Sequence, residues 1–133
     1  MTTHDPQISR QAAEQAMRGM LAYQAGQSAE QGVERHYLDR GGVTLARRWR
    51  GKAGEIDLIV DDGAGLVFVE VKKSRSHARA AQAVSRRQME RLCLASQEFM
   101  DAQGYSALTN MRFDVALMDG QGHIDVIENA FGA

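Results

Sequence analysis

The stretch from Gly54 to Lys73 constrains the fold of this chain most, because it has the pattern of a buried β-hairpin and yet carries charge at interior positions. Two largely apolar segments, 55–60 and 66–72, have the composition of strands. Between them lies the sequence Asp61-Asp62-Gly63-Ala64-Gly65, whose residues tolerate the backbone angles of a tight turn. The sequence therefore predicts two antiparallel strands joined by a short turn.

Successive side chains of a strand point to opposite faces of the sheet. In the second strand, this alternation places Glu70 and Lys72 on the face of Phe68 and three valines on the other face. In the first strand, Asp57 is expected to share a face with Ile59. The opposite face of the first strand is then expected to hold Ile56, Leu58 and Val60.

An acid in the middle of Val-Phe-Val-Glu-Val is costly to bury, because a desolvated carboxylate without partners is strongly unfavourable. A divalent cation between Asp57 and Glu70 would offset that cost, and hard oxygen ligands suit Mg²⁺ or Mn²⁺. Lys72 would then position the attacking water or stabilise charge that develops on a phosphate. The alternative is an edge strand with a solvated polar face, on which Glu70 and Lys72 form an ordinary ion pair. The acid on the preceding strand favours the metal site.

The arrangement of Asp57 and Glu70-Val71-Lys72 resembles the PD-(D/E)XK motif of nucleases. Further motifs, from about residue 26 to 131, resemble the YraN-like family of bacterial proteins in the same order. That family is similar in fold to archaeal Holliday junction resolvases and to restriction-endonuclease-like domains. The motifs are Gly26, Ala29-Glu30, Tyr37-Leu38, Arg47-Arg48-Trp49-Arg50, Gly54-Glu55-Ile56-Asp57-Leu58-Ile59, Phe68-Val69-Glu70-Val71-Lys72, Arg112-Phe113-Asp114-Val115 and Asn129-Ala130-Phe131.

The resemblance implies a metal-dependent nuclease, with branched DNA among its expected substrates. In this interpretation Asp57 and Glu70 bind Mg²⁺ or Mn²⁺ together with the backbone carbonyl of Val71. Lys72 positions the water, and the resemblance adds Glu30 as a further acid near the metal. From the residues alone, an acid in the first turn of a helix is equally well explained by the helix dipole.

Two positions depart from the family pattern. Where the family usually shows E-V-K-x-R, the arginine here is displaced by one position, to Arg75. Where a lysine commonly opens the following helix, this chain has Arg87, which keeps the charge but cannot transfer a proton. Neither departure touches Asp57, Glu70 or Lys72, but both affect the expected contacts with phosphate.

The net charge of −1 argues against general binding of nucleic acid, but the charges are unevenly distributed. Residues 72–91 hold seven basic side chains and one acidic side chain, and the block begins at the proposed catalytic lysine. These residues form either a surface that binds phosphates or a solvated charged face. The residues predicted to bind nucleic acid are Lys73, Arg75, Arg79, Arg86, Arg87, Arg48 and Arg50.

Periodicity and helix-ending residues predict the rest of the chain. A helix is expected from Asp5-Pro6 to about Ala25-Gly26, and a second helix from Ser28 to Arg40. Residues 1–25 lie largely outside the resemblance and are interpreted as a helical extension, and 26–133 as the PD-(D/E)XK nuclease-like domain. The other predicted elements are strands at 43–49, 112–118 and 123–127 and a helix at 80–103.

Single residues narrow the interpretation further. Cys93 is the only cysteine, which excludes an intramolecular disulfide and a multi-cysteine zinc site, and helical spacing predicts it in the core. Asp114, between two apolar residues, is expected to have a structural hydrogen-bonding role or a surface role and not to bind metal. The chain has neither a long apolar run nor a signal peptide, so we expect no membrane partner and a cytoplasmic location.

The predicted fold class is therefore α/β, a restriction-endonuclease-like core. Its central mixed sheet is flanked by helices in the order α-α-β-β-β-α-β-β, with the first helix as an extra N-terminal element. The predicted function is metal-dependent hydrolysis of phosphodiester bonds in nucleic acid, DNA in preference to RNA, by a homodimer. Two alternatives stay open: a nucleic-acid-binding module without catalysis, and an interaction subunit whose acids only satisfy a polar network.

Overall fold

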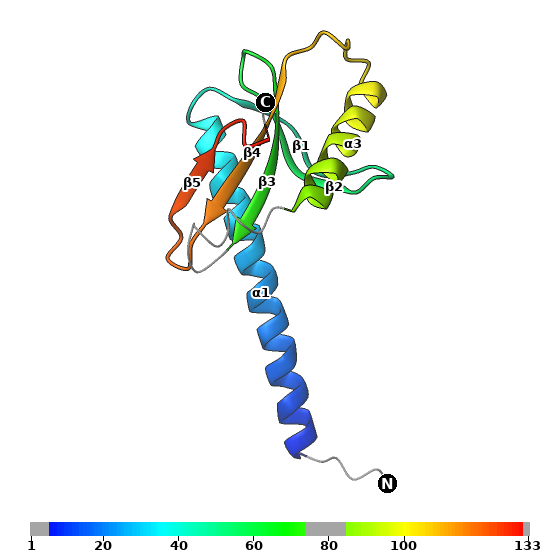
Figure 1. Ribbon diagram of the computed structural model, residues 1–133. Coiled ribbons are helices and arrows are strands. Elements are labelled where there is room, and N and C mark those ends of the chain that lie inside the picture. The colour runs from blue at the N-terminus through cyan, green and yellow to red at the C-terminus, as the bar shows by residue number, and fades with distance from the viewer. Residues whose placement is uncertain (1–5, 74–84, 132–133) are drawn as a thin grey trace.

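The computed structural model of the protein describes residues 6–73 and 85–131, except for the side chains of 6–8 and 22–28. A long helix packs on one face of a five-stranded sheet and a shorter helix on the other face (Figure 1). Element labels follow Figure 1 and pass from α1 to α3. In chain order the elements are α1 (Pro6–Leu38), β1 (Val43–Arg50), β2 (Glu55–Asp61), β3 (Leu66–Lys73), α3 (Arg86–Ala102), β4 (Met111–Met118) and β5 (Ile124–Ile127).

The sheet is mixed, as the sequence predicts, with the strands in the order β1-β2-β3-β4-β5. Neighbouring strands are antiparallel except β3 and β4, which are parallel. A parallel pair requires a crossover connection, and α3 lies in the connection between these two strands. The predicted hairpin turn is confirmed, because the Asp62 carboxylate accepts the N–H groups of Ala64 (2.9 Å) and Gly65 (3.0 Å).

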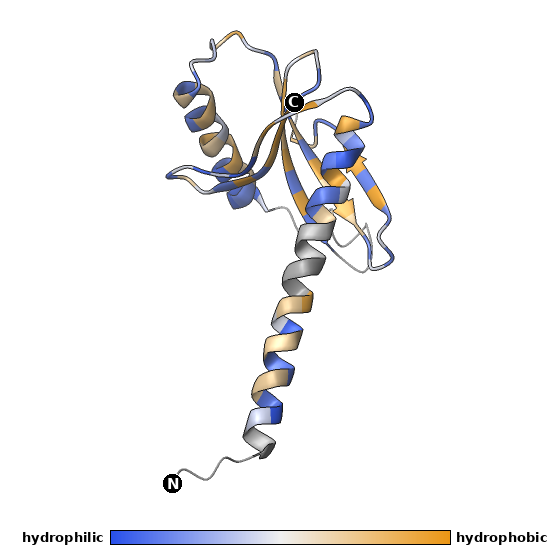
Figure 2. Cartoon of the chain, turned by 180° about the vertical axis from the view of Figure 1, so that it is seen from behind, coloured by the Kyte–Doolittle hydropathy of each residue, from blue (hydrophilic) through white to orange (hydrophobic). Residues whose placement is uncertain are grey.

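Two hydrophobic clusters hold the helices against the sheet, one beneath α1 and one beneath α3. Figure 2 shows the side of the sheet that α1 covers. Burying a side chain of this size stabilises the fold by about 1.5–3 kcal/mol, so each cluster is sufficient to fix its helix. Beneath α1 the buried residues are Val33, Tyr37, Leu58, Val60, Val67, Val69 and Ala116. Beneath α3 they are Ile56, Ile59, Leu66, Phe68, Leu92, Ala95, Phe99 and Met100.

The prediction of two N-terminal helices is wrong, because α1 is a single helix over Pro6–Leu38. The expected break at Ala25-Gly26 does not occur. A glycine inside a helix costs about 1 kcal/mol relative to alanine, which weakens a helix without ending it. The helix ends at Leu38, and the turn after it contains Gly41, whose φ of +85° favours glycine.

The N-terminal part of α1 projects beyond the sheet as a rod (Figure 1). Its large apolar side chains Met17, Met20 and Leu21 are 55–56% exposed. The first buried residue among those described along α1 is Ala29. In the described ranges, no helix combines the length and the apolarity that crossing a bilayer requires. The division of the chain at residue 25 stays a prediction.

The predicted start of this helix, at residue 80, lies outside the described residues. A continuous helix over 80–103 is wrong, because Ser85 has an extended backbone and caps a helix, α3, that starts at Arg86. The Ser85 hydroxyl accepts the N–H of Gln88, and the Gln88 side chain accepts the N–H of Ser85, both at 3.2 Å. This is the capping box that Ser-Arg-Arg-Gln encodes. The helix ends as predicted, at Gly104 with φ +75°.

Two further predictions can be compared with the structure. Cys93 is exposed on α3, so the prediction that it lies in the core is wrong. Asp114 is 1% exposed and makes the expected hydrogen bonds. It accepts the Tyr37 hydroxyl from α1 at 2.7 Å, the Arg112 Nε at 3.0 Å and the Asn129 N–H at 3.0 Å. Asp114 therefore ties α1, β4 and the C-terminal segment together.

Candidate active site

The candidate site lies where β2 separates from β3. The pairing between these strands runs from Asp61↔Leu66 to Leu58↔Val69 and stops there. Asp57 and Glu70 would form the next pair. Instead, the side chain of Asp57 accepts the N–H of Val71 at 2.8 Å, so a carboxylate takes the place of a ladder hydrogen bond.

The same separation corrects the predicted faces of β2. Beyond Leu58, β2 stays paired with β1, through Trp49↔Ile56 and Arg50↔Glu55, and leaves β3. Ile56 consequently packs in the cluster beneath α3, whereas Leu58 packs beneath α1. Asp57 lines a cavity beside α1 and does not share the face of Ile59. Strict alternation therefore does not hold in the part of β2 that has left β3.

The pKa of Asp57 is strongly raised by its surroundings in the site. Burial, followed by the repulsion of the nearby Glu70 charge, raises the pKa of Asp57 to about 7 from 3.8, although the N–H of Val71 acts in the opposite direction. The charges of Glu30 and Glu55 add to the rise in the pKa of Asp57. Asp57 therefore keeps its proton to a much higher pH than a free aspartate does.

Glu70 is the second buried acid and is 7% exposed on the central strand β3. Its Oε1 lies 3.4 Å from Lys72 Nζ, which confirms that these side chains share a face. The same oxygen lies 4.0 Å from Nη2 of Arg91 on α3. Two cations and a second acid thus surround one carboxylate, so Glu70 is not half of an isolated surface pair.

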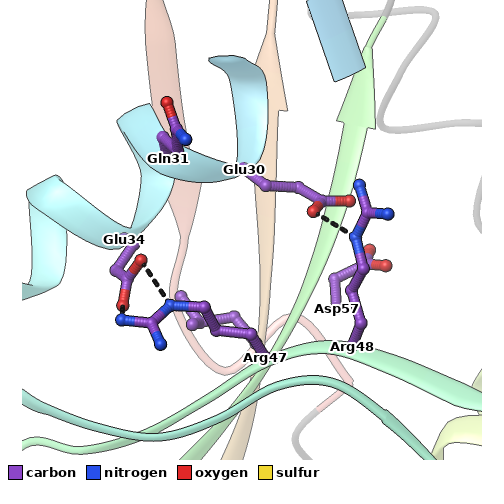
Figure 3. Close-up of a pocket in the computed structure, with 7 residues that line it drawn as sticks. Glu30, Gln31, Glu34, Arg47, Arg48 and Asp57 are labelled. Carbon is purple, nitrogen blue, oxygen red and sulfur yellow. Dashed lines mark hydrogen bonds and ion pairs between the residues drawn. The ribbon is translucent and has the colours of Figure 1, made fainter. Parts of the chain in front are cut away.

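Glu30 lies on the α1 side of the site, near Asp57 (Figure 3). Its Oε2 pairs with Arg48 Nε at 2.7 Å, and one turn later Glu34 pairs with Arg47 at 2.7 Å. These four side chains, with Gln31, Asp57 and Leu58, line a cavity of about 490 Å³. Arg48 adopts φ +48°, an uncommon conformation for a residue with a side chain.

The donor set fits a hard divalent cation. Asp57 and Glu70 supply carboxylate oxygens, which Mg²⁺ and Mn²⁺ prefer. Their mutual repulsion is the electrostatic condition that a bound cation relieves, and it already raises the pKa of Asp57. In the part of the chain that the structure describes, no three His, Cys, Asp or Glu side chains converge. A cation would therefore complete its shell with backbone oxygen and water, of which Mg²⁺ usually keeps several.

Comparison with known proteins places the chain in a family. The model of the family described as "Uncharacterised protein family UPF0102" matches residues 29–118. A UPF0102 protein of Cereibacter sphaeroides is 55% identical over 117 residues, which cover 88% of this chain and 100% of that protein. The chain belongs to the UPF0102 family. The predicted resemblance to the YraN family, the family of this model, is confirmed.

Other UPF0102 proteins are also similar to this chain over most of its length. One from Ruegeria pomeroyi is 52% identical over 117 residues, covering 88% of this chain and 95% of that protein. One from Roseobacter denitrificans is 48% identical over 112 residues, covering 84% and 87%. The UPF0102 match includes Glu30, Asp57, Glu70 and Lys72 but not the projecting part of α1.

The predicted nucleic-acid-binding residues fall into three groups. Arg48 and Arg50 are paired with Glu30 and Glu55, which reduces the charge they offer to a ligand. A second group is exposed close to the site in sequence. It consists of Lys73 at the end of β3 and Arg86 and Arg87 in the first turn of α3. The third group, Arg75 and Arg79, lies outside the described residues.

Sequence reasoning missed two residues that shape the site. Arg91 was counted only in the basic block, although its guanidinium lies beside Glu70. Glu98 accepts the N–H groups of Lys52 (2.6 Å) and Ala53 (2.7 Å), and so holds the turn between β1 and β2 against α3. The spacing of Arg87 and Arg91, one helical turn apart, was the available signal for Arg91. Glu98 had no signal in the sequence, because its partners are backbone groups 45 and 46 positions away.

Proposed function

We propose that this UPF0102 protein is a metal-dependent nuclease that hydrolyses phosphodiester bonds in nucleic acid, DNA in preference to RNA. The observation that carries the proposal is the meeting of two repelling carboxylates, Asp57 and Glu70, at the separation of β2 and β3, with Lys72 beside them. A fold does not keep such a group for stability, because replacing buried charges with apolar residues is often neutral or stabilising.

Each residue has a distinct role in this proposal. Asp57 and Glu70 hold Mg²⁺ or Mn²⁺, and the backbone carbonyl of Val71 is the proposed third ligand. The cation supplies a Lewis acid that neutralises charge on the phosphate and lowers the pKa of water. Glu30 is the proposed additional acid, and it becomes available to the site when a phosphate takes its place on Arg48.

Lys72 acts on the water and the phosphate and leaves the cation to the carboxylates. Its ammonium group, 3.4 Å from Glu70, is held where it can orient a water and donate to a phosphate oxygen. In the reaction, the water oxygen forms a new P–O bond and the P–O bond to one sugar oxygen breaks. The leaving sugar oxygen takes up a proton, and the products are a phosphomonoester and a hydroxyl.

The basic residues at the start of α3 support a nucleic acid as the substrate. Arg86 and Arg87 lie at the positive end of the helix dipole, where cations are unfavourable for the helix itself. Anionic phosphates gain from both the arginines and the dipole. Contacts with phosphates do not depend on base sequence, so such a surface suits DNA recognised by its shape, as bent or branched DNA is.

We also propose that the protein is a homodimer through the projecting part of α1. Met17, Met20 and Leu21 are exposed on a helix that no other described element covers. A second copy would bury these side chains and would bring the same apolar surface to the contact.

A cleavage assay tests the nuclease proposal. Wild type, Glu70→Gln and Lys72→Ala are incubated with Mn²⁺ and with branched DNA, duplex DNA, single-stranded DNA or structured RNA. We expect cleavage by wild type only, with a DNA substrate cleaved fastest. If wild type binds these nucleic acids and cleaves none of them, the protein is the binding module that is the alternative function.

A further inference from the structure

Arg91 carries an unusual polar group next to the proposed site. Its Nε is fully buried and has no hydrogen-bond partner, and it is the only such side-chain atom among the residues that the structure describes. A buried donor without a partner costs about 1–3 kcal/mol. An apolar side chain of the same length would avoid that cost, so stability does not account for an arginine here.

The backbone on the facing turn makes room for this side chain. A Cβ at Gly54 would lie 2.8 Å from Cδ and 3.2 Å from Cγ of Arg91, too close for any other residue. Gly54 also adopts φ +147°, which side chains rarely tolerate. The N–H of Gly51 bonds to the carbonyl of Gly54 at 3.0 Å, so the turn is fixed. The aliphatic stem of Arg91 is therefore held between its own helix, α3, and Gly54, the residue before β2.

The stem directs the guanidinium into a long ion pair with Glu70 that includes no hydrogen bond. Nη2 lies 4.0 Å from Glu70 Oε1, beyond hydrogen-bond distance, and the side chain is 38% exposed. Lys72 approaches the same oxygen more closely, at 3.4 Å. One carboxylate thus faces two cations, and an anion entering beside Glu70 would meet the excess positive charge.

We propose that Arg91 is a catalytic residue that binds the phosphate undergoing hydrolysis. This inference rests on the proposed nuclease function and names a residue that the PD-(D/E)XK motif does not contain. The planar guanidinium offers paired donors that match two phosphate oxygens. Negative charge grows on those oxygens as the water attacks, so the contact is strongest in the transition state.

The test compares Arg91→Met with Arg91→Lys and with Arg35→Met as the matched control. Arg35 is exposed in the last turn of α1, so its replacement removes the same charge away from the site. Four quantities are measured for each variant: kcat, KM, the affinity for Mn²⁺ and the midpoint of urea unfolding. Arg91→Lys retains the positive charge and loses the paired donors.

We expect Arg91→Met to lower kcat by about 100- to 1000-fold, the usual effect of losing one oxyanion donor. The unfolding midpoint should stay equal or rise, because the unpartnered Nε is gone. The affinity for Mn²⁺ should stay equal or rise, because a cation beside Glu70 is removed. Arg91→Lys should recover part of kcat, and Arg35→Met should match wild type.

Two results would overturn this inference and leave the proposed function standing. One is a wild-type kcat in Arg91→Met. The other is a lower unfolding midpoint of Arg91→Met together with weaker Mn²⁺ binding, which is the behaviour of a structural ion pair. If wild type cleaves no substrate, the proposed function fails and this inference fails with it. A substrate with one neutral methylphosphonate linkage identifies the phosphate. At that linkage the cost of Arg91→Met should largely disappear, whereas an unchanged cost at every linkage would contradict the contact.

Discussion

Replacing Asp57 with asparagine should make the metal-free protein more stable at neutral pH. The pKa of Asp57 is about 7 in the fold, against 3.8 for the free side chain, a difference of about 3 units. One unit corresponds to about 1.4 kcal/mol, so ionisation of Asp57 destabilises the fold by up to about 4 kcal/mol. Asparagine carries no charge, and its amide oxygen can still accept the N–H of Val71.

The raised pKa of Asp57 fixes the direction and the window of the pH dependence. Below pH 3.8 the carboxyl group is protonated in both the folded and the unfolded chain, so it has no pH-dependent effect. Between pH 4 and about 7 the unfolded chain loses this proton and the folded chain keeps it. Stability in the wild type is therefore lost as the pH rises, and the loss levels off above the folded pKa of Asp57.

The assay is urea unfolding of wild type and Asp57→Asn in a chelating buffer at pH 4.5, 6 and 8. The free-energy difference should favour the variant and should grow by about 2–4 kcal/mol from the lowest to the highest pH. Asp119→Asn, in the turn between β4 and β5, serves as a comparison that should stay nearly constant over this range, because the pKa of Asp119 is lowered from 3.8 and the group is ionised in both states at these pH values. A difference that does not change with pH, or an Asp57→Asn variant less stable at pH 8, would refute the raised pKa.

Three further outcomes are expected. Tyr37→Phe should lower the free energy of unfolding by about 1.5–3 kcal/mol in urea, because a buried carboxylate loses a hydrogen bond at 2.7 Å; an unchanged value would contradict the structural role of that contact. Replacing both Arg86 and Arg87 with alanine should reduce the salt slope of DNA binding by about 2 in fluorescence anisotropy. An unchanged slope would return both residues to the solvated-face interpretation. Light scattering over a concentration series should show a dimer for wild type and a monomer for Met17→Glu combined with Leu21→Glu. A monomeric wild type at high concentration would contradict the proposed dimer.

The sequence predicted the sheet well because local patterns determine it. Alternation in β2 and β3, and the turn at Asp61–Gly65, predicted the hairpin with ends correct to within one residue. The parallel pairing of β3 with β4 follows from a helix between two strands, a connection that periodicity also indicates. These elements could be predicted because each is determined by residues close to one another in the sequence.

The helix boundaries were less accurate, for identifiable reasons. Gly26 was taken as an end, whereas a helix ends where the backbone leaves the helical conformation, as it does in the turn that contains Gly41. The capping box at Ser85, which begins a helix at Arg86, was overlooked. Both errors come from using composition where backbone conformation decides.

The proposed site could be predicted only in part. Asp57, Glu70 and Lys72 were found because charge interrupts an apolar strand pattern. The separation of β2 from β3 could not be predicted, since it depends on a side chain replacing a ladder hydrogen bond. Helical spacing gave a signal for Arg91, but its approach to Glu70 could not be predicted, because that approach results from the packing of α3 on Gly54.

Calorimetric titration of Mn²⁺ at pH 6, repeated in two buffers of different ionisation enthalpy, tests the central claim most directly. Wild type should bind one ion and release up to about one proton, because Asp57 is still largely protonated at that pH. The Asp57→Asn, Glu70→Gln double variant should bind none. Lys72→Ala should bind Mn²⁺ like wild type, because its ammonium group is no ligand. Binding by wild type no stronger than by the double variant would contradict the metal site.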